Sequence, residues 1–119
     1  TAAPLAKAVA GDAAAFSAAS ALRAATLGGA RAMGLERSIG SIEPGKQADL
    51  ACVDLGQLES QPLFHVVSQL VYATGRHQVT DVWIGGRAKL SDRQLVDLDI
   101  EQLIANARQW RDRIAAVRA

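Results

Sequence analysis

The chain has 119 residues, a formal net charge of +1 and 50% hydrophobic residues, values typical of a single compact domain. Its 13 basic and 12 acidic residues are interspersed, so there is no overall basic field to attract nucleic acid. No apolar run reaches the ~18–20 residues that span a bilayer, and the N-terminus lacks a long apolar signal segment. We therefore expect a soluble, cytoplasmic protein that binds neither membranes nor nucleic acid.

Alanine and cysteine usage add two expectations. Alanine accounts for 24 residues, many of them between 2 and 32, so large side chains for a core are few. This segment suits close helix packing against another part of a protein. The single cysteine, Cys52, excludes an internal disulfide and fits a reducing compartment. Its place in the apolar run DLACVDL predicts a small buried hydrophobic residue.

Residues 2–33 are predicted to be helical. Pro4 suits a first helical position, and Asp12 can cap the run that follows it. Either Ser17 or Ser20 can start the next stretch, ASALRAAT, and Thr26 can cap a short helix after that. Gly34 should end this region, because glycine readily adopts the left-handed conformation that closes helices.

Residues 39–56 predict two short strands around a tight turn. Pro44 followed by Gly45 favours a type II turn, and the apolar run ADLACVDL is consistent with a buried strand. A loop is expected over residues 57–65. A third strand is then predicted over residues 66–73, VVSQLVYA, which are rich in β-branched residues.

Two further strands and a helix complete the predicted elements. The runs before and after Gly85-Gly86 predict a hairpin over residues 79–96. Asp99 can cap a C-terminal helix, whose apolar residues form one stripe: Ile100, Leu103, Ile104, Ala107, Trp110, Ile114 and Val117. The same helix carries an excess of basic residues, expected to form a solvated face: Arg108, Arg111, Arg113 and Arg118. Helices, then strands, then one helix indicate an α+β fold.

The residues alone show no catalytic or metal-binding constellation. The histidines are His65 and His77, twelve residues apart, with no HxH or HExxH pattern, so no zinc site is predicted within the chain. A triad of Ser68, His65 and Asp81 is formally possible, but no G-x-S-x-G elbow exposes a serine. We therefore assign no catalytic, cofactor-binding or metal-binding residue.

The remaining polar and aromatic candidates receive structural interpretations. Asp49 and Asp54 flank the apolar run and should make capping or turn hydrogen bonds, and Lys46 is expected to be a solvated turn residue. The large aromatic residues of the strand region are predicted to lie in the sheet core: Phe64, Tyr72 and Trp83. Gly28-Gly29 lacks a G-x-G-x-x-G or Walker pattern and indicates close helix packing.

Three segments, taken in order, resemble a known family. They are ATLGGARAMGL at residues 25–35, IGSIEPGKQADLACVDL at residues 39–55 and QPLFHVVSQLVYATGRHQVTDVWIGGR at residues 61–87. Together they are similar to the C-terminal portion of metal-dependent amidohydrolases. The resemblance is to the aminohydrolase and chlorohydrolase branch, which includes methylthioadenosine/S-adenosylhomocysteine deaminases and triazine hydrolases. The last segment is more similar to the nucleoside deaminases.

The resemblance implies a (β/α)8 barrel joined to a small β-sandwich, with zinc or iron activating a water. In such families every metal ligand and catalytic residue lies in the part that precedes Thr1, and a barrel takes ~250 residues. The resemblance therefore implies three regions here. They are the last barrel helices at 1–38, a β-sandwich portion at 39–96 and a C-terminal helix at 97–119.

Two hypotheses follow. In the first, the chain is the C-terminal fragment of a hydrolase that acts on non-peptide C–N bonds, deaminating a purine nucleoside or a related heterocycle. It would be inactive alone and would bind either the missing N-terminal barrel or further copies of itself as a homo-oligomer. Unsatisfied strand edges and apolar helix faces are then expected. The alternative is a stand-alone, non-catalytic α+β interaction module.

Overall fold

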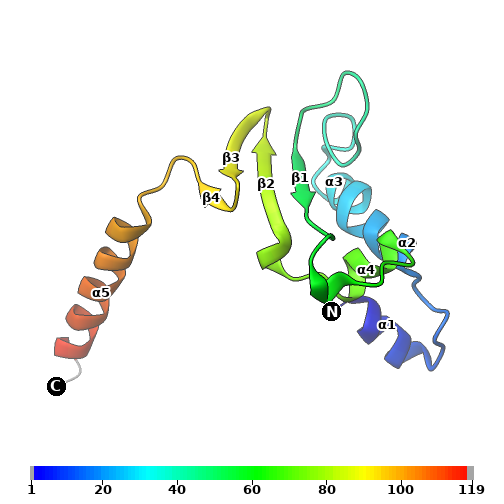
Figure 1. The fold of residues 1–119 in the computed structure, drawn as a ribbon, viewed down its shortest axis with the longest axis horizontal. Helices are drawn as coiled ribbons and strands as arrows, with labels where there is room; N and C mark the ends of the chain where they lie inside the picture. Colours follow the sequence, from blue (N-terminus) through cyan, green and yellow to red (C-terminus); the bar gives the residue numbers. More distant parts are fainter. Residues whose placement is uncertain (1, 118–119) are drawn as a thin grey trace.

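A computed structural model describes residues 2–117 and has an α+β fold (Figure 1). Arg118, which was counted in the basic face of the last helix, lies outside the described residues. The α-helices are α1 (Ala2–Ala10), α2 (Ala18–Arg23), α3 (Gly29–Ala32), α4 (Val66–Tyr72) and α5 (Ile100–Val117). The strands are β1 (Leu50–Val53), β2 (Val79–Ile84), β3 (Arg87–Ser91) and β4 (Gln94–Leu95). Short helical turns cover Ala24–Gly28, Leu58–Ser60 and Arg76–Gln78.

The N-terminal helical region is interrupted once. Helix α1 stops at Gly11, which has a φ of +62°, and α2 starts after Ser17, whose Oγ accepts the backbone N–H of Ser20 at 3.2 Å. Asp12 accepts the N–H of Ala14 and stabilises the turn between the helices, so its predicted role as a helix cap is wrong.

From α2 to α3 the backbone is continuously helical through a π-helical segment, Ala24–Gly28. Thr26 does not cap a new helix, because its hydroxyl donates to the carbonyl of Leu22 at 2.8 Å within the same run. The predicted end of this region is confirmed by Gly34, which has a φ of +71°.

The four strands form one antiparallel sheet in the order β1-β2-β3-β4. Leu50 of β1 lies opposite Trp83 of β2. The predicted hairpin between β2 and β3 is confirmed, and both Gly85 and Gly86 have the positive φ that a tight hairpin turn needs. Asp92 and Arg93 repeat this conformation between β3 and β4.

The predicted strand at residues 66–73 is helix α4 instead. Two physical reasons favour the helix. Strand β2 already has neighbours on both sides, and α4 packs against α2. Tertiary contact has therefore overridden the strand preference of the β-branched residues.

The first of the two strands predicted within residues 39–56 is also absent from the described structure. Residues 39–49 are irregular, and Gly40 and Gly45 have φ values of +91° and +90°. The predicted turn is confirmed, since the N–H of Lys46 donates to the carbonyl of Glu43 at 3.2 Å across Pro44-Gly45.

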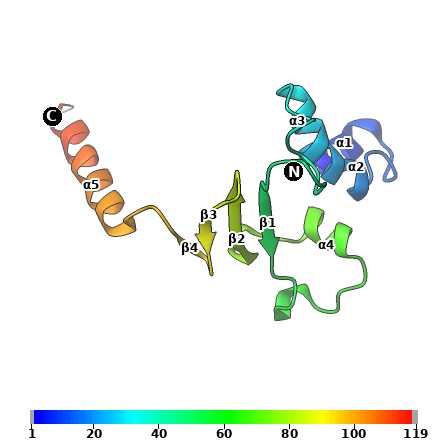
Figure 2. The same ribbon diagram turned by 90° about the horizontal axis from the view of Figure 1, so that it is seen from above.

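The molecule is extended. Its radius of gyration is 18.8 Å, compared with roughly 13–14 Å for a compact domain of this length. Helix α5 stands away from the sheet and from the other helices in both ribbon views (Figures 1 and 2). Within residues 2–117, no helix combines the length and apolar character needed to cross a membrane.

Few side chains of the described residues are buried, so several core predictions are wrong. The buried apolar residues are Ala3 and Ala30. Cys52 is exposed, Phe64 is 85% exposed and Tyr72 is also exposed. Trp83 alone of the three predicted core aromatics is partly buried. The sheet and helices therefore leave apolar surface that they do not cover themselves.

Candidate functional site

The most buried polar side chain of the described residues is Gln78, which is 1% exposed. Its Oε1 accepts the N–H of Gly75 at 2.9 Å. Its Nε2 donates to the hydroxyl of Ser60 at 2.7 Å and to the carbonyl of Asp54 at 3.2 Å. Every donor and acceptor group of this amide therefore has a partner, as a buried polar group requires. Gln78 joins the end of β1, the Leu58–Ser60 turn and the start of β2.

Asp54 and Arg93 extend this polar cluster to the β3–β4 turn. The guanidinium of Arg93 donates to Asp54 Oδ2 at 3.0 Å and to the carbonyl of His77 at 3.2 Å. Asp54 also accepts the N–H of Gly56 at 2.9 Å, and this bond, followed by those from Gln57 and Arg93, lowers the pKa of its carboxyl. The predicted turn-bonding role of Asp54 is confirmed.

Asp49 fixes the start of β1 to the β2–β3 turn. Its Oδ1 accepts the backbone N–H of Gly85 at 2.6 Å, and the N–H of Gly86 donates to the carbonyl of Ala48 at 3.1 Å. The predicted turn hydrogen bond of Asp49 is thereby confirmed.

Lys46 differs from the prediction. Its side chain is only 12% exposed, and its Nζ donates to the hydroxyl of Ser41 at 2.6 Å beside Glu43. The hydroxyl of Ser41, and then the charge of Lys46, lower the pKa of Glu43. The expected solvated lysine is therefore part of a local hydrogen-bonded turn.

The triad considered from the sequence is not assembled by any hydrogen bond among the described residues. Asp81 Oδ1 accepts the N–H of Asp92 at 3.2 Å. Hydrogen bonds from the side chain of Thr80 and the N–H of Asp92 lower its pKa. Ser68 lies within α4, and His65 directly precedes that helix. This arrangement offers no activated nucleophile.

The histidines lie in separate settings. His77 Nε2 lies 3.4 Å from Glu59 Oε1, and both side chains are more than half exposed. Between residues 2 and 117, no three His, Cys, Asp or Glu side chains gather closely enough to hold a metal ion. These residues do not fit a catalytic metal, and we assign no reaction step to one on this chain. The sequence assignment of no catalytic, cofactor or metal residue stays a prediction.

An open groove of about 810 Å³ lies between the α2–α3 helical run and the sheet. Its lining is mostly apolar and includes Leu22, Gly29, Met33, Leu50, Val82 and Trp83. Such a surface suits apolar side chains of another protein segment, because it has few polar groups to orient a charged substrate.

The sheet edge beside this groove has no partner strand within the described chain. Strand β1 pairs with β2 on one side only, and its central residues Ala51 and Cys52 are exposed. An unpaired edge presents backbone N–H and C=O groups that can bind a further strand. The groove and this edge together form the candidate interface of the chain.

Sequence reasoning missed the central residues of the polar cluster. A glutamine before a strand and an arginine in a hairpin turn carry no local pattern that predicts burial or ion pairing. Their partners lie far away in the sequence, since Arg93 and Asp54 are 39 positions apart. Predicting this ion pair would have required knowing that the two turns meet at one end of the sheet.

Comparison with protein families matches residues 1–89 to the Amidohydrolase family. A 5-methylthioadenosine/S-adenosylhomocysteine deaminase of Teredinibacter turnerae is 48% identical over 112 residues, which are 94% of this chain and 25% of the relative. The deaminase of the same name from Saccharophagus degradans is 38% identical over all of this chain and 27% of its own length. The chain thus spans about a quarter of the length of the curated relatives it matches.

Solved structures give the same relationship. A zinc-bound adenosine deaminase from Xanthomonas campestris is 70% identical, with a TM-score of 0.94 over 97% of this chain and 26% of that protein. A zinc-complexed atrazine chlorohydrolase from Arthrobacter aurescens is 26% identical, with a TM-score of 0.73 over 80% of this chain and 21% of that protein.

Proposed function

This chain belongs to the amidohydrolase family, and on that premise we propose that it is the C-terminal part of a metal-dependent hydrolase of non-peptide C–N bonds. The proposed reaction is deamination of a purine nucleoside or a related heterocycle. The observation that carries the proposal is the similarity of nearly the whole chain to a zinc-bound adenosine deaminase. The names of the curated deaminases support the same reaction class.

The chain's own part in this enzyme is structural. We propose that residues 1–38 are the last helices of a (β/α)8 barrel, that residues 39–96 are part of a β-sandwich, and that residues 97–119 form a closing helix. The apolar groove and the unpaired edge of β1 support the proposal that another part of the polypeptide covers them. The metal would be held by that other part, since residues 2–117 gather no ligand set.

The proposed partners are this barrel and further copies of the protein as a homo-oligomer. The exposed apolar side chains on both the helices and the strands support such contacts. A cytoplasmic location is part of the proposal and is supported by the lone Cys52.

Ammonia release tests this function. Two proteins are purified: the product of the complete reading frame that contains the chain, and the 119-residue chain alone. Each is incubated with 5′-methylthioadenosine, S-adenosylhomocysteine and adenosine in the presence of zinc. We expect the complete polypeptide to release ammonia from at least one substrate, and a chelator to abolish the activity. The chain alone should release none. Chelator-sensitive release that rises with the concentration of the isolated chain would contradict the proposal, as would a complete reading frame that encodes no barrel.

A further inference from the structure

The helical run beside the groove contains one turn that is wider than its neighbours. Between α2 and α3, residues Ala24–Gly28 form a π-helix, whose backbone hydrogen bonds span five residues instead of four. The N–H of Gly29 donates to the carbonyl of Ala24, five residues back, and also to that of Thr26. A single π turn within an α-helix amounts to one inserted residue, and such turns are rare and frequently lie at functional sites.

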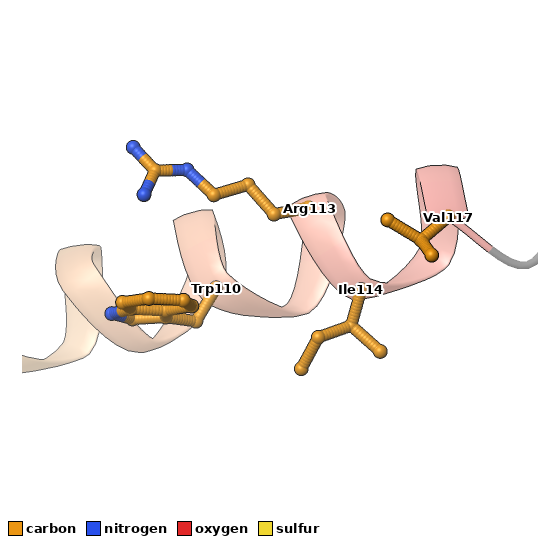
Figure 3. A pocket seen from close by; sticks show the side chains of 4 residues that line it. All are labelled: Trp110, Arg113, Ile114 and Val117. Atoms are coloured by element: carbon orange, nitrogen blue, oxygen red, sulfur yellow. The ribbon is translucent and has the colours of Figure 1, made fainter.

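Helix α5 shows the ordinary helical spacing for comparison. Four of its residues line one hollow of about 270 Å³ (Figure 3): Trp110, Arg113, Ile114 and Val117. The last three follow the first by three, four and seven positions, as neighbours in an α-helix do. In the π-helical turn the close positions are five apart, since a Cβ on Gly28 would lie 3.4 Å from the carbonyl oxygen of Arg23. The wide turn is therefore a local feature of the run beside the groove.

The inserted residue determines which way α3 faces. One residue corresponds to a rotation of about 100° along an α-helix. If the run were α-helical throughout, α3 would be turned by this angle relative to α2, and Gly29 would take the place of Ala30. Ala30 is buried where the loop at Gly40 packs on the run, since a Cβ on Gly40 would lie only 2.8 Å from the Cβ of Ala30. Met33, which lines the groove, would be turned with it.

Thr26 lies in the middle of the wide turn and bonds to the turn before it. Its hydroxyl donates to the carbonyl of Leu22 at 2.8 Å and lies 3.5 Å from the carbonyl of Arg23. A threonine hydroxyl that donates to a carbonyl four residues back competes with the backbone N–H for that acceptor, which weakens and bends a helix. The hydroxyl therefore acts where the hydrogen-bond spacing changes from four residues to five.

We propose that Ala24–Gly28 is a one-residue spacer, held open by the hydroxyl of Thr26, that sets which residues of α3 face the groove. The two ends of the run are fixed separately, α2 by packing against α4 and Ala30 by the loop at Gly40. Their relative rotation requires the inserted residue. The spacer thus determines the apolar lining of the candidate interface, and it needs no catalytic activity.

Deleting one residue tests the spacer. Ala24 and Ala25 are identical neighbours, so removing one of them leaves the rest of the sequence unchanged. In crystal structures of the complete protein, made from the full reading frame, we expect deletion of Ala24 to give a continuous α-helix. The N–H of Gly29 should then donate to the carbonyl of Ala25, and Ala30 should keep its contact with the loop. A run that keeps its π turn, or that turns Ala30 away from the loop, would overturn the proposal.

Deletion of Ala21 is the matched control, because it removes the same atoms from the regular part of α2. It turns the first residues of α2 by about 100° relative to the rest of the run, although α2 packs against α4. In thermal unfolding of the complete protein, we expect deletion of Ala24 to change the melting temperature by less than about 3 °C and deletion of Ala21 to lower it by about 5 °C or more. Equal effects of the two deletions, or no folded protein after deletion of Ala24, would overturn the proposal.

Two substitutions test the part that Thr26 has in the spacer. Thr26→Val removes the hydroxyl, and Thr26→Ser keeps it. We expect Thr26→Val to lower the melting temperature by about 2–4 °C, and by much less after deletion of Ala24, when no wide turn remains to be held. Thr26→Ser should stay close to the unmodified protein. An equal loss from Thr26→Val with and without the deletion would show that the hydroxyl does not hold the spacer open.

Ammonia release separates this inference from the proposed function. Release from the complete protein, together with equal effects of the two deletions, refutes only the spacer. A confirmed spacer in a complete protein that releases no ammonia refutes only the proposed function.

Discussion

At the residue scale, Gln78 is the side chain on which the packing of three turns depends. Its amide joins Gly75, Ser60 and Asp54, and it has almost no contact with solvent. Truncating it would leave the buried hydroxyl of Ser60 and the partly buried N–H of Gly75 without these partners. Unsatisfied buried polar groups are costly, so this residue should contribute more to stability than its exposed counterparts.

We therefore expect Gln78→Ala to lower the free energy of unfolding by about 1–3 kcal/mol. Urea denaturation followed by circular dichroism measures the change. Gln109→Ala on the exposed surface of α5 is the matched control and should have an effect within about 0.5 kcal/mol. Equal effects of the two variants would show that the Gln78 hydrogen bonds are not stabilising.

Gly40 is required by space as well as by backbone conformation. A Cβ at this position would lie 2.8 Å from Cβ of Ala30, and the φ of Gly40 is +91°. Gly45 has nearly the same φ but no atom within 4 Å of its hypothetical Cβ. Alanine at Gly45 should cost about 1 kcal/mol from backbone strain alone, and alanine at Gly40 clearly more. Thermal unfolding of Gly40→Ala and Gly45→Ala measures the difference, and equal melting temperatures would exclude a close approach at Gly40.

Acid stability should depend on Asp54. Hydrogen bonds from Gly56 and Gln57, together with Arg93, lower the pKa of its carboxyl in the folded state below its usual range. A lowered folded pKa stabilises the fold above the unfolded pKa, and this contribution is lost as the pH falls through the folded pKa. Between pH 6 and pH 3 the melting temperature of Asp54→Asn should therefore fall less than that of the unmodified chain. Parallel pH profiles would contradict the assigned hydrogen bonds.

Local roles were the predictable part of the site. Asp54 could be assigned a turn hydrogen bond because its partner Gly56 is two residues away. For Asp49 the kind of bond could be predicted but not the partner, because Gly85 is 36 positions away in the sequence. The burial of Gln78 and the ion pair of Arg93 could not be predicted, because they require two distant turns to meet. Cys52 was predicted to be buried because of its apolar run, and Phe64 because it is a large aromatic residue of the predicted strand region. Both are exposed in the described chain.

At the scale of elements, helices and strands with strong local sequence signals were predicted correctly, and those in ambiguous apolar runs were not. The Gly85-Gly86 hairpin and the helix after Asp99 rest on turn and cap chemistry that acts within a few residues. Residues 66–73 contain no such turn or cap residues, and packing against α2 favours the helix that they form. The segment before β1 contains two glycines with positive φ, which break the expected strand.

The start of α5 gives a direct test at this scale. Asp99 Oδ1 accepts the backbone N–H of Gln102 at 3.0 Å, as predicted for a helix cap. Asp99→Ala should destabilise the first turn by about 1 kcal/mol and reduce helical circular dichroism. Asp112→Ala removes an equal charge from the middle of the helix, where Asp112 pairs with Arg111. If Asp112→Ala lost as much helicity as Asp99→Ala, the cap would have no special role.

At the scale of the whole molecule, the extended shape and the uncovered apolar surfaces support the proposal that the chain is part of a larger enzyme. The resemblance of three sequence segments to amidohydrolases is confirmed by the family match and by relatives similar over nearly the whole chain. The apolar helix faces were expected from the family resemblance, and the many alanines predicted only close packing of residues 2–32 against another part of a protein. The positions of the groove and of the free edge of β1 could not be predicted from the sequence, because they depend on how the helices and strands are arranged in the fold.

We propose that this chain supports an enzyme whose metal site lies in another part of the polypeptide. Metal analysis after zinc loading and desalting, on the purified 119-residue chain and on the complete polypeptide, is the decisive measurement. We expect a stoichiometric metal in the complete polypeptide and none retained by the isolated chain. Stoichiometric zinc retained by the isolated chain, and lost when His65 and His77 are replaced by alanine, would contradict it.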